Sequence, residues 1–233
     1  MIPLRDSEAT HRLAPANTIL ILANIVVFAL EVRLGHRASA MIARYAMVPA
    51  HLMHVRLAAP RRALEAVTTI FTSTFLHAGF LHIVGNMLYL FIFGPAVEER
   101  MGTARYLLFY LAAAAAAGLA MVAMGPESRV PVIGASGAIA GVLGAYFVLY
   151  PRGRITTIVP LVILWPIVEI RAYFYLLVWF VAQLYAGIAS GGSGPLMGGV
   201  AWWAHVGGFL FGIAAGPLLA RNRPVAARRA KRA

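Results

Sequence analysis

Four polar residues that could act together on a carbonyl group lie in apolar stretches of this sequence. Ser136 stands in the run GASGAIAG (134–141), His205 follows in AWWAHVGG, and His82 precedes Asn86 by four positions. A serine hydroxyl is a poor nucleophile until a base removes its proton, and His205 can be that base. His82, Asn86 and the backbone amide of Ser136 could donate hydrogen bonds to the oxyanion that forms after attack. The residue types therefore indicate nucleophilic attack on a carbonyl carbon by a serine–histidine pair.

The glycines around Ser136 also allow a simpler interpretation. Small residues recur at four-residue spacing in two segments, at Ser136, Ala140 and Gly144 and again at Gly208, Gly212 and Gly216. Such faces let two membrane helices approach closely, and this pattern alone favours a serine that serves only helix packing. If the two faces meet, however, His205 comes beside Ser136. Gly134 and Gly137 would also let a substrate backbone pass close to the hydroxyl.

The composition places these residues in a membrane protein. Of the 233 residues, 61% are apolar and 12% are charged, and there is no cysteine. Soluble domains have about a quarter charged residues, whereas a bilayer core of about 30 Å needs about 20 apolar helical residues. We expect an all-α polytopic bundle with six spans, at residues 17–32, 80–97, 104–124, 132–150, 172–189 and 200–220.

The distribution of basic residues predicts the orientation. With both termini inside, the inner segments hold twelve Lys and Arg and the outer segments hold seven, as the positive-inside rule favours. Residues 1–16 are then a cytoplasmic N-terminus, residues 17–220 one membrane domain and residues 221–233 a basic cytoplasmic tail beside anionic lipid. The basic residues are scattered between apolar segments, so we expect no nucleic-acid partner. Cleavage of the first span as a signal peptide is a weaker alternative.

This topology brings the four candidates to one depth. Spans two, four and six begin on the outer side, and the four residues lie near those beginnings, within about 5–10 Å of the same face at 1.5 Å per residue. His82 and Asn86 share one helix face because they are four apart. No carboxylate is expected at this depth, so the prediction is a serine–histidine dyad and not a triad.

Two segments between the spans are harder to interpret. Residues 34–69 form a long first loop whose apolar patches (41–49 and 64–71) predict short helices in the membrane interface. Residues 155–170 are apolar but contain Pro160, Pro166 and Glu169, which favours an interfacial or re-entrant piece over a seventh crossing.

Longer motifs resemble the rhomboid family of intramembrane serine proteases. They are FTSTFLHAGFLHIVGNMLYLFIFG (71–94), VEERMG (97–102), GASGAIAG (134–141) and AWWAHVGGFLFG (201–212), in family order and spacing. The resemblance implies Ser136 as nucleophile and His205 as general base, with His82 and Asn86 as oxyanion donors. It also implies six spans with both termini inside, without a metal or cofactor. The Arg- and Ala-rich composition is of a bacterial style and suggests a plasma membrane.

The resemblance further implies how substrates are used. They would be membrane proteins with a transmembrane helix, cut near the outer face, with the fifth span as the side of approach and residues 187–199 as a cap over the site. A non-catalytic relative that binds transmembrane helices is the alternative. The sequence leaves the oligomeric state open.

The chain departs from some relatives in two places. Thr68 and Thr69 stand where some relatives have a Trp-Arg pair, and Ala140 stands where some have a tyrosine that stacks on the base. The group that orients His205 is therefore open, with Trp202, Trp203 or the glycine contacts as candidates.

Several other polar residues have structural interpretations. Asn24 and Gln183 are expected to form interhelical hydrogen bonds, and Glu98 and Glu99 to fix the inner loop. His77 precedes His82 by five positions and does not share its helix face, so we expect no zinc site there.

Overall fold

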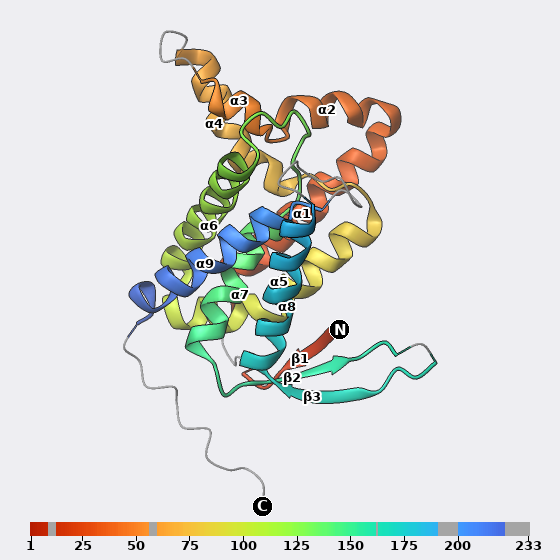
Figure 1. Ribbon diagram of the computed structural model, residues 1–233, viewed down its shortest axis with the longest axis vertical. Helices are drawn as coiled ribbons and strands as arrows, with labels where there is room; N and C mark the ends of the chain where they lie inside the picture. Colours follow the sequence, from red (N-terminus) through yellow and green to blue (C-terminus); the bar gives the residue numbers. More distant parts are fainter. Residues whose placement is uncertain (9–12, 56–59, 162, 191–199, 222–233) are drawn as a thin grey trace, which may run out of the picture.

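The computed structural model is a helical bundle with a small sheet at one end and short helices at the other (Figure 1). It describes residues 1–8, 13–55, 60–161, 163–190 and 200–221. The expected cap (187–199) therefore lies mostly outside the described residues, and so does the basic tail beyond Arg221.

Six longer helices form the bundle and match the expected spans closely. They are α1 (Pro15–Leu34), α5 (Phe80–Met101), α6 (Thr103–Met124), α7 (Ser136–Leu149), α8 (Ala172–Ala189) and α9 (Trp202–Leu219). All of them except α7 are long and apolar enough to cross a membrane; the first such segment continues as far as Tyr45. The helical membrane bundle is thus confirmed.

The expected fourth span (132–150) is shorter than predicted, because α7 begins only at Ser136 and has 14 residues. The residues before it are not helical: Val132 forms an antiparallel bridge with Met47, and Gly134 has a φ of +114°. That left-handed conformation favours glycine and stops the helix from extending toward residue 132. Ser136 therefore stands at the N-terminus of a helix and not within one.

The first loop folds into short helices, as its apolar patches predict. They are η1 (Gly35–Arg37), α2 (Ala38–Tyr45), α3 (Pro49–Met53), α4 (Pro60–Thr72) and η2 (Ser73–Phe75). Together they form the end of the molecule opposite the sheet (Figure 1).

The segment 155–170 corrects the all-α prediction, because it is neither a re-entrant helix nor a seventh helical crossing. Strands β2 (Arg154–Ile158) and β3 (Ile167–Arg171) form an antiparallel hairpin, and β1 (Ile2–Asp6) pairs with β2 to give the sheet order β1-β2-β3. The β-branched residues of ITTI and IV favour strands, while Pro160 and Pro166 near the hairpin end exclude a continuous helix.

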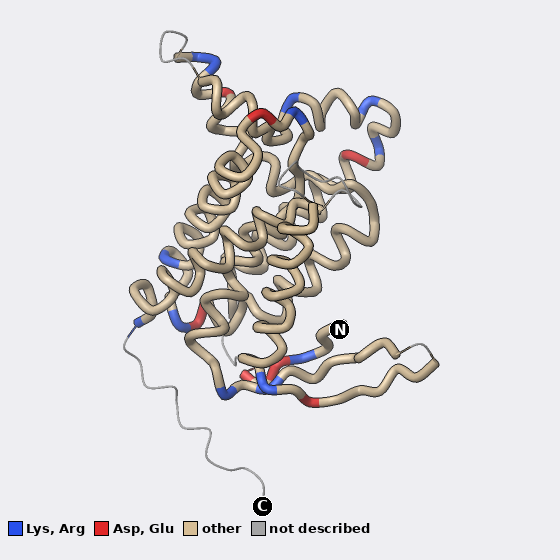
Figure 2. Tube along the Cα trace, in the orientation of Figure 1, with Lys and Arg blue, Asp and Glu red and all other residues tan. Residues whose placement is uncertain are grey.

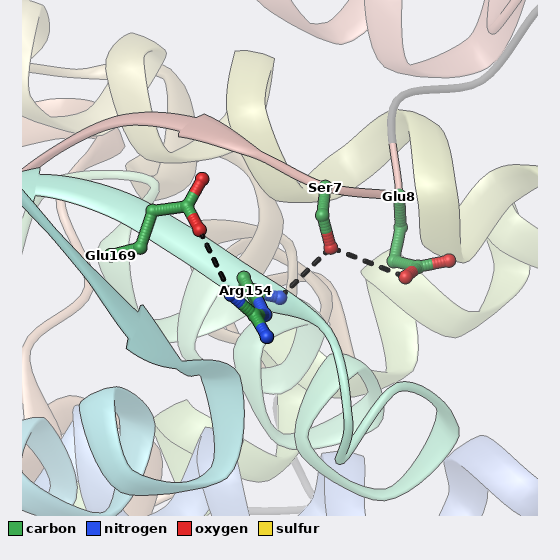
Figure 3. A network of polar contacts seen from close by, with 4 residues as sticks. All are labelled: Ser7, Glu8, Arg154 and Glu169. Carbon is green, nitrogen blue, oxygen red and sulfur yellow. Dashed lines mark hydrogen bonds and ion pairs between the residues drawn. The ribbon is translucent and has the colours of Figure 1, made fainter. Parts of the chain in front are cut away.

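Polar contacts hold the N-terminal segment against this hairpin (Figure 3). The Arg154 backbone N–H donates to the Ser7 hydroxyl at 2.8 Å, and the Arg154 guanidinium pairs with Glu169 at 3.2 Å. Residues 1–8 are thus part of the fold and not a free terminal extension.

Charged residues gather toward the two ends of the bundle, and the middle is almost free of them (Figure 2). Met1 lies at the end that carries the sheet (Figure 1), and the Arg221 backbone N–H donates to the carbonyl of Arg100 at the C-terminus of α5. A band of uncharged surface between two charged ends is what a bilayer requires. The protein is therefore a multi-pass membrane protein.

At the sheet end, α1 is capped by a carboxylate from the α5 C-terminus. Glu98 is 2% exposed and accepts the backbone N–H groups of Ala16 (3.1 Å) and Asn17 (2.8 Å). The first N–H groups of a helix have no intrahelical acceptor, so a carboxylate there satisfies them and interacts favourably with the helix dipole. The structural role expected for Glu98 is confirmed.

In the centre, α7 and α9 pack with their backbones in direct contact. A Cβ atom at Gly208 would overlap the carbonyl oxygen of Gly137, and one at Gly212 would overlap that of Gly141. The small-residue faces meet as expected, and their contact sets the distance between the N-terminal turns of the two helices.

Replacing Gly212 by alanine should therefore destabilise the bundle, by about 1–3 kcal/mol, because the added methyl must push two backbones apart. Thermal unfolding in detergent measures this. The matched control is Gly85→Ala in α5, where a Cβ meets no atom within 4 Å, so that the melting temperature should stay or rise. Equal stability of the two variants would contradict the backbone contact.

Candidate active site

Two of the predicted residues meet directly. Ser136 is the first residue of α7, His205 lies in the first turn of α9, and the Ser136 Oγ is 2.8 Å from the His205 Nε2. His205 is buried, with 7% of its surface exposed, whereas Ser136 is partly exposed. This is the separation that proton transfer from a serine to a histidine requires.

The α5 residues reach the same place from the opposite side. A Cβ atom at Gly134 would lie 2.8 Å from the His82 Nε2 and 3.7 Å from the Asn86 Nδ2. Both side chains therefore approach the backbone two residues before Ser136. Only a glycine at position 134 leaves room for these two side chains. Glycine also adopts the positive φ of this position without strain.

Both α5 side chains can donate hydrogen bonds there. The His82 Nδ1 accepts the Ala78 backbone N–H at 3.3 Å, so in the neutral ring the proton lies on Nε2. The Asn86 Nδ2 is buried and has no hydrogen-bond partner among the described residues. An unpartnered buried donor is costly and unusual in a folded protein, and it is available for a ligand.

These residues share a cavity of about 500 Å³. Its walls come from four helices: His82 and Asn86 from α5, Ser136 from α7, Trp179 and Gln183 from α8, and His205 from α9. A second cavity, of about 780 Å³, lies among α2, α3 and α4 and is lined by none of these six residues. We take the smaller cavity as the reaction site because it contains the serine–histidine pair.

The site includes one residue whose place the sequence analysis missed. Gln183, expected to form an ordinary interhelical bond, lies with its Oε1 2.7 Å from the His205 Nδ1. Span five ends at the membrane face where spans two, four and six begin, so the position of Gln183 six residues before the end of α8 was a usable signal.

Aromatic rings complete the surroundings of His205. The Trp179 ring lies 5.8 Å from the imidazole at 35°, and the Trp202 ring lies 6.2 Å away and perpendicular to it. Trp203 instead packs on Gly187. Of the candidates expected to orient the histidine, Trp202 is in place, and Trp179 was not foreseen.

A buried carboxylate does lie near this end of the bundle, contrary to expectation. Glu31, near the C-terminus of α1, is 5% exposed and accepts the His77 backbone N–H at 3.3 Å. The His77 ring is 5.1 Å from that of His82, and burial with the nearby His82 lowers the pKa of His77 to about 4. Neither Ser136 nor His205 forms a hydrogen bond with this carboxylate, so Glu31 is not a third member of the serine–histidine pair.

No cluster of three or more metal-binding side chains occurs in the part of the chain that the structure describes. His77 and His82 face each other there without a third His, Asp or Glu in a ligating arrangement.

Parts of this chain are similar to proteins named as rhomboids. GluP of Bacillus subtilis, named a rhomboid protease, is 43% identical over 76 residues, which cover 33% of this chain and 14% of GluP. The YdcA protein of the same organism is 40% identical over 77 residues, covering 33% and 38%. Rhomboid-like protein 11 of Arabidopsis thaliana, a chloroplast protein, is 33% identical over 147 residues, covering 61% and 49%. The chain thus spans less than half of the length of these relatives.

A broader match agrees with these local similarities. Residues 64–222 match the Rhomboid domain, and this stretch contains all four residues singled out by their chemistry as well as Gln183. The chain belongs to the rhomboid family.

Proposed function

We propose that this protein is an intramembrane serine endopeptidase that uses Ser136 as nucleophile and His205 as general base. The 2.8 Å contact between the Ser136 Oγ and the His205 Nε2 is the observation that carries the proposal. A helix-packing serine needs no base beside it, and a non-catalytic family member needs neither residue.

The reaction begins when the Ser136 hydroxyl transfers its proton to the His205 Nε2 and the oxygen attacks the scissile carbonyl carbon. Charge then develops on the carbonyl oxygen. The His82 Nε2–H, the Asn86 Nδ2–H and the Ser136 backbone N–H are the donors that stabilise it. The amide at the first position of α7 has no intrahelical acceptor, so it is free for this purpose.

Collapse of the tetrahedral intermediate breaks the peptide C–N bond. His205 gives its proton to the leaving nitrogen, and the acyl group stays on the Ser136 Oγ as an ester. Water then attacks this ester with His205 again as base, which releases the acid and restores the hydroxyl.

The substrates are membrane proteins with a transmembrane helix, which approach from the lipid between α5 and α8. Residues of both helices line the cavity, and α8 packs mainly on α9 while α5 packs on α1 and α7. The substrate segment must unwind there, since the carbonyls of a helix are hydrogen-bonded and unavailable. Gly134 and Gly137 do not leave the space for its backbone that the sequence led us to expect, because His82 and Asn86 pack on Gly134 while Ala117 and Ala204 pack on Gly137.

The site faces the outer side of a bacterial plasma membrane, and both termini are cytoplasmic. This orientation rests on the excess of basic residues in the inner segments. It also rests on the position of Met1 at the sheet end (Figure 1) and on the backbone hydrogen bond from Arg221 to Arg100, two residues after the Glu98 cap at that end.

The nucleophile and base are tested with purified wild type, Ser136→Ala and His205→Ala. Both variants should lose cleavage of a labelled transmembrane substrate, by about 10³-fold or more, and Ser136→Ala should not react with a fluorophosphonate probe. If Ser136→Ala still cleaves the substrate and takes the label, the mechanism is wrong. Loss of wild-type cleavage on adding a chelator would indicate a metal-dependent reaction instead.

The oxyanion role predicts that Asn86→Ala lowers kcat by about 10²-fold with little change in KM, because its amide acts mainly on the transition state. Steady-state cleavage of the same substrate gives both constants. The matched control is Asn24→Ala, which removes another buried amide, one that bonds the Leu20 carbonyl within α1. A loss of similar size in both variants would point to folding and not to the oxyanion.

A further inference from the structure

The His205 ring has a second polar contact besides Ser136. The Gln183 Oε1 lies 2.7 Å from its Nδ1, and the Gln183 and His205 side chains are both buried. Gln183 comes from α8 and shares the cavity wall with Trp179, whereas His205 comes from α9. The imidazole is therefore held between α7 and α8 through its two nitrogens.

We propose that Gln183 is a positioning residue that sets the tautomer of His205 for the proposed reaction. An amide oxygen can only accept a hydrogen bond, so the ring must carry its proton on Nδ1 and donate it to Gln183. The Nε2 then has a free lone pair directed at the Ser136 hydroxyl. The opposite tautomer would place a hydrogen on Nε2, and His205 could not remove the serine proton.

The same contact remains useful after proton transfer. When Nε2 takes the serine proton, the ring becomes an imidazolium with two N–H groups, and Gln183 continues to accept from Nδ1. Nothing else moves in this step: the Nδ1 proton stays on the ring, and the Nε2 proton later goes to the leaving nitrogen. Gln183 thus occupies the position that a carboxylate holds in a Ser-His-Asp triad, without becoming charged.

An amide suits this location better than a carboxylate. An ionised side chain inside a bilayer is costly, and its partner here would be a neutral ring in the resting protein. The nearby buried carboxylate, Glu31, is directed at the His77 backbone instead. An amide oxygen supplies the acceptor without the cost of burying a charge.

The position of Gln183 on α8 has a further consequence. This helix forms one wall of the cavity that the substrate enters, so a displacement of α8 away from α9 would remove the Nδ1 acceptor. The hydrogen bond that orients His205 therefore depends on the packing of α8 against α9.

The test compares Gln183→Leu, which keeps the approximate size but removes the acceptor, with Gln183→Glu, which keeps an acceptor oxygen. Gln183→Leu should lower kcat about 10- to 100-fold with KM within about threefold. Gln183→Glu should keep most of the wild-type kcat. The control is Tyr185→Leu on the same helix, whose side chain is 75% exposed, and which should leave both constants unchanged.

A spectroscopic measurement reports the tautomer of His205 directly, without reference to activity. Nitrogen-15 NMR of histidine-labelled protein, with the His205 signal assigned by its loss in His205→Asn, should show wild-type His205 protonated on Nδ1. In Gln183→Leu the two tautomers should mix, an effect that a merely structural role of Gln183 would not produce. Wild-type His205 protonated on Nε2, or a folded Gln183→Leu with full kcat, would overturn this inference.

The inference rests on the proposed function, and the two can fail separately. If Ser136→Ala is inactive while Gln183→Leu is fully active, the protease proposal stands and only the role of Gln183 is lost. If Ser136→Ala is active, the proposed function itself is wrong.

Discussion

The close contact between α7 and α9 is the constraint on which the site depends. Gly208 and Gly212 let the α9 backbone touch the carbonyl oxygens of Gly137 and Gly141. Because helices are rigid over this length, the contact also fixes the separation of their N-terminal turns, where Ser136 and His205 lie 2.8 Å apart. A side chain at either glycine would separate the helices and the two polar groups together. Packing and chemistry are therefore two consequences of one interface.

The cost of burying polar groups explains much of the remaining arrangement. In a bilayer each such group needs a partner inside the protein. Glu98 caps α1, Asn17 bonds the Leu90 carbonyl and Tyr106, and Gln183 bonds His205. The Asn86 amide nitrogen differs, because it has no partner among the described residues and lies in the wall of the cavity. The Asn86 N–H group, which lies beside the serine, forms a stabilising hydrogen bond only when a substrate oxygen reaches it.

Most of the helical fold was predictable because a membrane span is a local property of the sequence. An apolar run of about 20 residues can be located from the sequence alone. The predicted fifth span, residues 172–189, has the same bounds as α8 in the structure. The sheet was not predictable in this way, since β1 and β2 are about 150 residues apart and pair only in the folded chain. The shortness of α7 was missed for a related reason. The bridge of Val132 to Met47 and the positive φ at Gly134 break an apolar run that looks continuous.

The sequence by itself determined which helices exist and which polar residues share a depth, because both follow from hydropathy and from the rise of a helix. It also carried the motifs that place the chain in the rhomboid family. Only the tertiary structure decided which side chains meet. Helix rotation and lateral position place Gln183 on His205, Trp179 beside the imidazole and Glu31 on His77. These depend on packing among several helices at once, which no single span encodes.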